Sequence, residues 1–384
     1  MTAIDRLRRR AAFLLLGLFA LVLAGCAAPP QPSSGGGGAQ VAMLLPYGVG
    51  DPGVEGQARA IENAARLAIA DLSGAEIDLR VYSTAGDPAR AAQVARQAVD
   101  EGADVIVGPL FSEAANAAGQ AVAGRGVNVL SLSNNAEIAG GNVFVLGYTF
   151  GDIARRVVGF AAAQGRSRIM IVYPETSAGA VARDATVRAV AASGATLAGS
   201  RAYPFSQDGI VAAATAIATD LRSTGATAAV LTDTTTGGLP LMAEMLRDNG
   251  VGAGETQFLG LTRWDIPPQT LTQAGLQGGL FARPDPDFLT PFQTRYAQTY
   301  GAPPTALAPL GYDAIAAIGA LAAGGAGDFD TGRLIRPSGF VGASGIFRLL
   351  PNGTSQHGLA IATIRDAQVD IVDPAPRRFG GAGS

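Results

Sequence analysis

The stretch Val105-Ile106-Val107-Gly108-Pro109-Leu110-Phe111-Ser112 decides the fold of this chain. Three β-branched apolar residues predict a short buried strand, and Gly108 and Pro109 end it. Alanine-rich residues 112–123 follow with helical spacing, and a second apolar run occupies residues 127–132. A strand, a helix and a strand in this order predict a parallel sheet whose two faces are covered by helices.

The same alternation extends in both directions from this stretch. Two such series, one before and one after about residue 148, predict an α/β fold of two doubly wound lobes, each with its own parallel sheet. The first series predicts further strands at 41–45, 79–82 and 143–145, a helix at 57–72, and a helix that Asp87 caps and Pro88 opens. The second predicts strands at 168–173, 196–203, 228–231 and 257–261, and helices at 152–164, 178–192, 209–222 and 239–249.

The end of the chain departs from this alternation. Residues 346–349 and 359–364 flank Pro351-Asn352-Gly353, which predicts a hairpin, and residues 368–372 predict a third antiparallel strand. A β segment this late must return to a lobe built earlier, so we expect multiple crossovers between the lobes. The expected division assigns 41–147 and about 282–340 to the first lobe, 148–281 and about 341–373 to the second, and 374–384 to a loose tail.

The N-terminus predicts export and a lipid anchor. A basic start precedes an apolar run at 11–22, which is the order of a secretory signal peptide and is shorter than the roughly 20 residues of a membrane span. Leu23-Ala24-Gly25-Cys26 resembles a bacterial lipobox, which implies that residues 1–25 are removed and that Cys26 carries acyl chains such as palmitate. The alternative is a plain signal peptide that ends at a chance cysteine. Ala27 stands where an Asp usually retains such lipoproteins at the inner membrane, which implies outer-membrane sorting.

The residues after the signal peptide divide by composition into a tether and a folded body. Residues 26–40 are rich in Pro, Ser and Gly, which predicts a flexible tether after the lipidated cysteine. About 340 residues remain, more than one hydrophobic core usually serves. Hydrophobic residues make up 48% of the chain and charged residues 15%, as in a folded body. With a net charge of −3 and no basic stripe, the chain lacks the surface of a nucleic-acid binder.

The sequence offers little for catalysis. His357 is the only histidine and Cys26 the only cysteine, so the usual zinc ligand sets and an internal disulfide are excluded. No G-x-S-x-G elbow frames a serine, and the glycines at 35–38 precede no G-K-S/T, so neither a serine hydrolase nor a P-loop is expected. We expect His357 to be a solvated turn residue. We also expect a protein that binds without catalysing a reaction and that needs no metal or cofactor.

Four motifs, in order, resemble the type I periplasmic binding proteins, the fold of the leucine/isoleucine/valine-binding family. The resemblance covers roughly residues 40–373 and implies two lobes with a ligand cleft between them. The motifs are Val41-Ala42-Met43-Leu44-Leu45-Pro46, Val105-Ile106-Val107-Gly108-Pro109-Leu110, Val129-Leu130-Ser131-Leu132-Ser133-Asn134 and Leu310-Gly311-Tyr312-Asp313-Ala314.

Two subfamilies fit this resemblance. One is the penicillin-binding protein activator family (LpoA type), outer-membrane lipoproteins that stimulate a bifunctional penicillin-binding protein in peptidoglycan synthesis. The other is the solute receptor of an ABC transporter, which hands an amino acid or similar small polar ligand to an ABC permease. The activator is favoured by Leu45-Pro46-Tyr47-Gly48, by Gly108-Pro109-Leu110, and by the closing pattern from Gly342 through Pro351-Asn352-Gly353 to 369–372. The large N-terminal helical-repeat domain of that family is absent from this sequence.

The predicted fold indicates where a ligand would bind. Ligands of open α/β sheets sit at the carboxyl ends of the strands, and two facing lobes form a cleft from those ends. The loop after Gly108 leads into a helix N-terminus that attracts a carboxylate, and Ser112, Ser131 and Ser133 would complete an anion cradle. The candidate cleft residues are Tyr47, Pro109, Leu110, Ser112, Ser131, Ser133, Asn134, Asn135, Tyr148, Tyr173, Asp233, Trp264 and Asp265.

Two acids are candidates for holding the other end of a ligand. Amino-acid receptors of the family have S-x-A-x-T in the second loop, whereas here Asn135 replaces the Thr, which counts against an amino acid. Asp233 or Asp265 would pair with an ammonium group, and the alternative for Asp233 is a loop cap before the following helix. We expect Trp264 on an exposed loop, as a cleft wall, as an anchor for a partner protein, or in ordinary packing.

Overall fold

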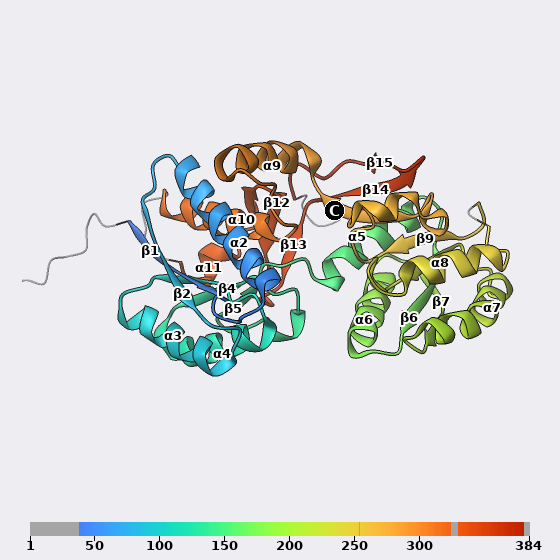
Figure 1. Cartoon of the computed structure of the whole chain (residues 1–384), viewed down its shortest axis with the longest axis horizontal. Coiled ribbons are helices and arrows are strands. Elements are labelled where there is room, and N and C mark those ends of the chain that lie inside the picture. The colour runs from blue at the N-terminus through green and yellow to red at the C-terminus, as the bar shows by residue number, and fades with distance from the viewer. Residues whose placement is uncertain (1–37, 253, 324–328, 380–384) are drawn as a thin grey trace, which may run out of the picture. The chain divides into compact units, whose positions relative to one another are not determined.

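The computed structural model describes residues 38–252, 254–323 and 329–379. The expected signal peptide, Cys26 and most of the tether therefore lie outside the described residues. Within those ranges, no helix has the length and apolar character that a membrane crossing requires. Two central sheets confirm the predicted α/β architecture of two lobes (Figure 1).

The first lobe is built on a parallel sheet with the strand order β2-β1-β3-β4-β5. Alternate residues of β1 face opposite sides: Met43 packs in the core with α2 and α10, whereas Leu44 packs in the core with α3 and α4. Both faces are thus buried, as the continuous apolar runs predict. The strands are β1 (Ala39–Leu45), β2 (Ile77–Ser83), β3 (Val105–Val107), β4 (Asn128–Ser131) and β5 (Val143–Val145), and the helices are α2 (Pro52–Asp71), α3 (Pro88–Asp100) and α4 (Ser112–Val122).

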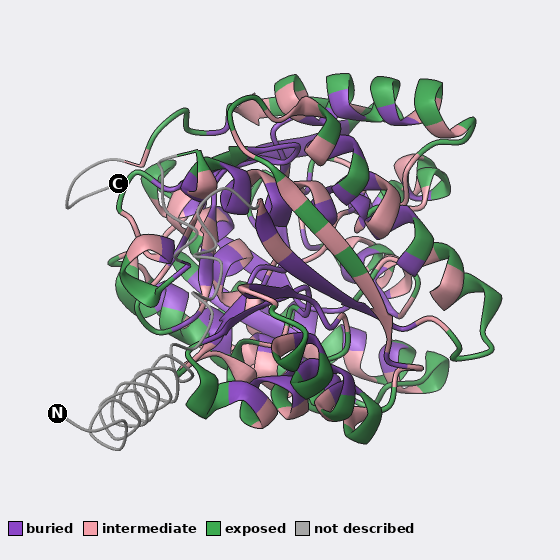
Figure 2. Cartoon of the chain, turned by 90° about the vertical axis from the view of Figure 1, so that its left-hand side faces the viewer, coloured by how far each residue is buried: buried purple, intermediate pink, exposed green. Residues whose placement is uncertain are grey.

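The second lobe contains a seven-stranded sheet with the order β15-β14-β10-β9-β8-β6-β7. Strands β6 to β10 are parallel, and β14 and β15 add an antiparallel edge. In Figure 2, where the first lobe faces the viewer, buried residues are concentrated in strands and exposed residues lie on the outer faces of the helices. The strands are β6 (Arg168–Pro174), β7 (Thr196–Tyr203), β8 (Ala228–Leu231), β9 (Gln257–Gly260), β10 (Leu280–Pro284), β14 (Leu359–Arg365) and β15 (Gln368–Asp373), and the helices are α5 (Phe150–Ala163), α6 (Ser177–Ala192), α7 (Gln207–Ser223) and α8 (Leu239–Asp248).

A later segment returns to the first lobe. Phe340, Phe347 and Leu349 share one core cluster with Met43, so the small antiparallel sheet β11-β12-β13 packs with the first lobe. Residues 341–357, which the sequence analysis assigned to the second lobe, therefore lie with the first. The segment comprises α9 (Pro286–Tyr300), α10 (Ala308–Ala322), α11 (Thr331–Leu334), β11 (Phe340–Gly342), β12 (Gly345–Leu349) and β13 (Ser355–His357), and short 3-10 turns elsewhere span Ala123–Arg125, Ala136–Ile138, Pro268–Thr272 and Ala274–Leu276.

The expected hairpin has a different second strand. The turn at Pro351-Asn352-Gly353 joins β12 to β13, with Phe347 opposite His357, and not to residues 359–364. Those residues form β14, which pairs with β10 of the second sheet. The reason lies in burial: Leu359 to Ile364 are all buried, and a strand buried on both faces needs a covered central position that the small sheet does not offer.

The chain crosses between the lobes at three places within the described residues. The crossings lie between β5 and α5, between β10 and α9, and between β13 and β14. They are packed together: the rings of Tyr148, from the first crossing, and His357, from the third, have centroids 4.5 Å apart. Asp285, in the second crossing, donates its backbone N–H to the carbonyl of Ser344 at 3.2 Å. The prediction of multiple crossovers is therefore correct.

Residues 374–379 form a further link between the lobes, which we call the C-terminal strap. Arg377 pairs with Asp285 at 2.8 Å and also with Asp287, and its guanidinium lies 5.2 Å from the centroid of the Phe288 ring. The ring of Phe379 lies 4.6 Å from the guanidinium of Arg348 in the first lobe. The strap thus leaves β15 of the second lobe and attaches to the first, where the sequence analysis expected a loose tail. Residues 380–384 lie outside the described residues.

Candidate functional site

The carboxyl edge of the first sheet brings two of the predicted loops together. Gly108 has φ +89°, and a Cβ atom there would lie 2.2 Å from the carbonyl oxygen of Leu44, so only glycine fits. Its N–H donates to Leu130, and the carbonyl of Pro109 accepts from the N–H of Leu132. The loop after β3 is thereby held against the loop after β4. Leu110 packs against the core of this lobe.

Within the described residues, no side chain caps the N-terminus of α4. Phe111 occupies the cap position and supplies no side-chain acceptor; α8 and α10 also lack a side-chain cap, whereas α2, α3, α5, α6, α7 and α9 are capped by side-chain oxygens. Glu113, in the first turn, is exposed. The free N–H groups of the first turn, with the hydroxyl of Ser112 beside them, form a surface that favours an anion.

The loop after β4 uses part of its polar groups internally. The hydroxyl of Ser131 is buried, donates to Pro109 at 3.3 Å and accepts from the N–H of Ser133 at 3.2 Å. The hydroxyl oxygen of Ser133 accepts from the N–H of Asn135 at 3.1 Å, and Asn135 in turn caps the N–H of Glu137. Ser131 therefore shapes the loop, whereas the hydroxyl hydrogen of Ser133 has no acceptor within the described residues. Asn134 is exposed.

The three predicted tyrosines lie in different surroundings. Tyr47 donates its hydroxyl to Glu62 at 2.7 Å, and burial together with this carboxylate raises its pKa. Tyr173 lies under Arg183, whose guanidinium is 5.3 Å from the ring centroid. The hydroxyl of Tyr148 is buried at the first crossing without a hydrogen-bond partner in the described residues, and its pKa is raised by desolvation and by Asp313. Among the described residues, no hydrogen bond or ring contact joins any of these three tyrosines to Ser133.

The two acids predicted to hold an ammonium group are engaged in the structure. The Asp233 carboxylate accepts from the Tyr203 hydroxyl at 2.8 Å, and from the backbone N–H of Thr234 at 2.7 Å and of Gly238 at 2.9 Å. Both N–H groups belong to the loop before α8, whose cap residue is Gly238, so the carboxylate holds this loop, as the loop-cap alternative for Asp233 describes. Asp265 accepts two hydrogen bonds from Arg263, at 2.6 and 2.5 Å, and lies 3.3 Å from Arg283.

Trp264 does not lie on an exposed loop, so that prediction is wrong. The residue is 0% exposed and packs beside Phe281, with ring centroids 6.3 Å apart. A Cβ atom at Gly260 or Gly279 would lie 2.1 or 2.0 Å from the indole. The two glycines create the space that the ring fills, so Trp264 is a core residue and neither a cleft wall nor a partner anchor. Those flanking glycines are the signal in the sequence that indicates a buried ring.

His357 is also placed differently from its prediction as a solvated turn residue. Its side chain is 1% exposed, and Nδ1 lies 3.0 Å from Oδ2 of Asp152, which also accepts from the backbone N–H of His357 at 3.1 Å. Arg155 contacts the other carboxylate oxygen at 3.1 Å. Asp152 begins α5 of the second lobe and His357 ends β13 of the first, so the pair joins the lobes. Their separation of 205 residues explains why no local pattern indicated it.

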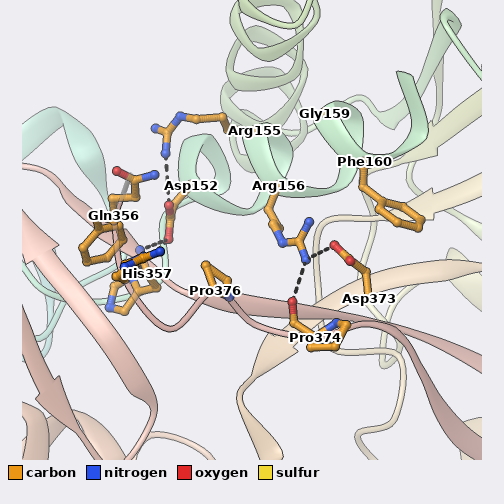
Figure 3. A pocket seen from close by; sticks show the side chains of 12 residues that line it. Asp152, Arg155, Arg156, Gly159, Phe160, Gln356, His357, Asp373, Pro374 and Pro376 are labelled. Atoms are coloured by element: carbon orange, nitrogen blue, oxygen red, sulfur yellow. Dashed lines mark hydrogen bonds and ion pairs between the residues drawn. The ribbon is translucent and has the colours of Figure 1, made fainter. Parts of the chain in front are cut away.

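A pocket with none of the predicted residues lies beside this pair (Figure 3). Its volume is about 330 Å³. Figure 3 shows Arg156 reaching from α5 to Asp373 and Pro374, and Arg155 reaching Asp152. The lining residues are Asp152, Arg155, Arg156, Gly159, Phe160, Gln356, His357, Asp373, Pro374, Pro376, Arg378 and Phe379. Among the described residues, no group of three or more His, Cys, Asp or Glu side chains is arranged to hold a metal ion.

Comparisons with solved structures agree with this architecture. A putative branched-chain amino acid ABC transporter protein from Rhodospirillum rubrum is 18% identical, with a TM-score of 0.74 over 87% of this chain and 100% of that one. A leucine-binding protein from Thermotoga maritima is 21% identical, with a TM-score of 0.60 over 88% and 98%. An ABC transporter solute-binding protein from R. palustris, solved with benzoate, is 18% identical, with a TM-score of 0.58 over 88% and 98%. At these identities the likeness shows the fold.

Comparisons of the sequence identify the family. A search of curated proteins found no significant match. The family model described as periplasmic binding protein matches residues 40–368, which is most of the chain. The match spans both lobes and all three crossings, and it ends within β15. The chain therefore belongs to the periplasmic binding protein family, with the type I fold.

Proposed function

We propose that this protein is the non-enzymatic solute receptor of an ABC transporter and that it binds a small organic carboxylate at the carboxyl edge of the first sheet. The observation that carries the proposal is the uncapped N-terminus of α4, where Ser112 begins the helix, together with the loop of Ser133, which hydrogen bonds to Pro109 hold against the preceding loop. Donors of this kind suit a carboxylate. Family membership supports a binding role, and the solved relatives named above are transport receptors.

The preferred ligand carries no ammonium group. A buried ammonium needs an acidic partner, and both candidates, Asp233 and Asp265, already accept hydrogen bonds from protein donors. Glu175 directly follows β6 and is exposed, and its carboxylate has no hydrogen-bond or ion-pair partner within the described ranges. An amino-acid ligand would have to use Glu175 instead. The R. palustris relative was solved with benzoate, which has a carboxylate and no ammonium group.

The test compares two ligands that differ at one group. Leucine and 4-methyl-2-oxopentanoate share the carboxylate and the branched side chain, and only leucine carries the ammonium. We expect calorimetric titration to show at least about tenfold tighter binding of the oxo acid, because desolvating an unpaired ammonium is unfavourable. Tighter binding of leucine, lost on Glu175→Gln, would overturn the assignment and make the ligand an amino acid. Failure of both to bind would remove the carboxylate proposal itself.

We further propose that the protein faces the periplasm on a lipid anchor at Cys26, in the outer membrane. The lipobox resemblance at Leu23-Ala24-Gly25-Cys26 supports the anchor, and the residue after it, Ala27, supports the sorting. Labelled palmitate is expected in the wild-type chain and not in Cys26→Ser, which should fractionate with soluble periplasmic proteins. Labelling that persists in the variant would contradict the anchor.

The expected activator of peptidoglycan synthesis remains a prediction without support from the relatives named above. A crosslinked pull-down from native membranes distinguishes the two roles, with Cys26→Ser as control. Enrichment of permease subunits agrees with the receptor. Enrichment of a bifunctional penicillin-binding protein, without permease, would replace the receptor by the activator.

A further inference from the structure

We propose that the pocket between α5 and the C-terminal strap is a second binding site, for a small organic anion with an apolar body such as an arylcarboxylate. The site is separate from the carboxyl edge of the first sheet, because its lining includes none of the residues assigned there. The shape, the charge and the position of the pocket suit such a ligand.

The shape suits a compact ligand. The volume of about 330 Å³ falls in the range of small-molecule sites, which starts near 300 Å³. Phe160 of α5 and Phe379, Pro374 and Pro376 of the strap supply apolar surface, and the space beside Gly159 is open. A flat ring or a branched aliphatic body fits walls of this composition.

The charge suits an anion. Three arginines line the pocket, against two carboxylates. The carboxylates are already paired: Asp152 with His357 and Arg155, and Asp373 with Arg156. Arg378 has no hydrogen-bond or ion-pair partner in the described part of the chain and is exposed. A guanidinium with free donors binds a carboxylate through two parallel hydrogen bonds, so Arg378 and the outer N–H groups of Arg155 are the expected contacts.

The position places an occupant against both lobes. Gln356 and His357 come from β13 of the first lobe, Phe160 from α5 of the second, and Phe379 from the strap that links them. A ligand that touches both lobes where the chain crosses between them changes the relative free energy of lobe arrangements in proportion to its differential affinity. The pocket is thus placed to couple an anion to binding at the carboxyl edge.

The test fills the pocket with a side chain of the protein itself. Gly159 lies inside α5, and a Cβ atom there meets no atom within 4 Å, so Gly159→Phe projects a ring into the space without disturbing the helix. Gly56→Phe is the matched control, because Gly56 is a helical glycine of α2 with equally open surroundings. The probe is benzoate, and its neutral isostere benzamide tests the need for charge. Ser133→Ala identifies any benzoate bound at the carboxyl edge.

In calorimetric titrations, we expect Ser133→Ala and Gly56→Phe to bind benzoate at this pocket as the wild type does. Gly159→Phe should weaken this binding at least about tenfold, and Arg378→Gln should weaken it by a similar factor. Benzamide is expected to bind this site at least about tenfold more weakly. The proposal is overturned if wild-type protein binds no benzoate at millimolar concentration, if Gly159→Phe leaves all benzoate binding intact, or if benzamide binds as well. Loss of binding in Ser133→Ala alone would leave the receptor assignment standing and remove the second site.

Discussion

The carboxyl edges of the two sheets carry similar polar residues and use them in opposite ways. In the first lobe α4 begins at Ser112, its cap residue Phe111 supplies no acceptor, and the hydroxyl of Ser133 donates to no acceptor in the described residues. In the second lobe the carboxylate of Asp233, which follows β8, satisfies three donors, among them the backbone N–H of Gly238 just before α8. The first edge therefore has hydrogen-bond donors that a ligand can use, whereas the polar groups named at the second edge are bonded to other groups of the protein.

The contrast shows that position at a strand end does not by itself make a binding residue. Asp265 and Trp264 follow β9 at the edge where ligands of this architecture bind, yet one is held by Arg263 and Arg283 and the other is wholly buried. What distinguishes the first edge is the set of donors without an internal acceptor. Substitutions at the two edges should therefore separate stability from ligand affinity.

The largest effect is expected from Trp264→Ala in the second lobe. Removing an indole that is 0% exposed leaves a cavity between Gly260, Gly279 and Phe281. The free energy of unfolding should fall by about 3–5 kcal/mol, measured by urea denaturation, with carboxylate affinity unchanged where the variant is folded. A loss below about 1 kcal/mol would mean that the ring is not a core residue, and the contrast between the edges would weaken.

The second prediction compares two buried carboxylates. Unlike Asp233, Asp313 in α10 has one carboxylate oxygen without a partner in the described residues, and desolvation raises its pKa to about 6. A folded-state pKa above the unfolded value means that the stabilising contribution is present below the unfolded pKa near 4 and is lost as the pH rises through about 6.

Asp313→Asn should remove this pH dependence. Between about pH 4 and pH 8, the wild-type free energy of unfolding should fall by a few kcal/mol relative to that of the variant, measured by denaturation at both pH values. Asp233→Asn serves as the control position, where the native carboxylate is satisfied by three donors. Parallel pH profiles for wild type and Asp313→Asn would show that Asp313 stays ionised throughout.

The third prediction concerns Asp233→Ala. The change leaves the Tyr203 hydroxyl and the N–H groups of Thr234 and Gly238 without their acceptor. We expect a loss of about 2 kcal/mol in unfolding free energy, with the affinity for 4-methyl-2-oxopentanoate unchanged. Affinity that falls at least tenfold while stability holds would return Asp233 to the binding site.

Much of the fold can be predicted from local pattern. Runs such as 105–107 and 228–231 are apolar throughout, and a strand buried on both faces requires that composition. The late strands were harder, because the hairpin at 351–353 obeys local turn rules but the partner of 359–364 depends on which sheet has a free edge. The strap at 374–379 is held by Arg377 and Phe379 across long separations, which no window of sequence contains.

The residues of the candidate site also divide into those that local sequence predicts and those that depend on tertiary contacts. Ser112 and the α4 N-terminus are local features, because a strand, a glycine turn and a helix follow one another between residues 105 and 112, and Ser133 is local in the same sense because it directly follows β4. Whether Asp233 or Asp265 is free depends on Tyr203, Arg263 and Arg283, and whether His357 is solvated depends on Asp152. These partners are set by tertiary packing, so the sequence indicated which residues reach the edge and not which are available there.

The smallest effect on stability, and the clearest separation of stability from affinity, is expected from adding a side-chain cap to α4 at the first edge. Phe111 is 38% exposed at the cap position of α4 with an extended backbone, φ −86° and ψ 138°, which suits an Asp. Phe111→Asp should satisfy N–H groups of the first turn and raise the free energy of unfolding by about 1 kcal/mol relative to Phe111→Ala, which removes the ring without adding an acceptor.

The same Asp carboxylate would occupy the place of the ligand carboxylate and repel it. Binding of 4-methyl-2-oxopentanoate should therefore weaken at least about tenfold in Phe111→Asp relative to Phe111→Ala, measured by calorimetry beside the denaturation curves. A variant that gains stability and keeps its affinity would show that the ligand does not use this helix end. Because the two quantities are expected to move in opposite directions, no general loosening of the fold can imitate the result.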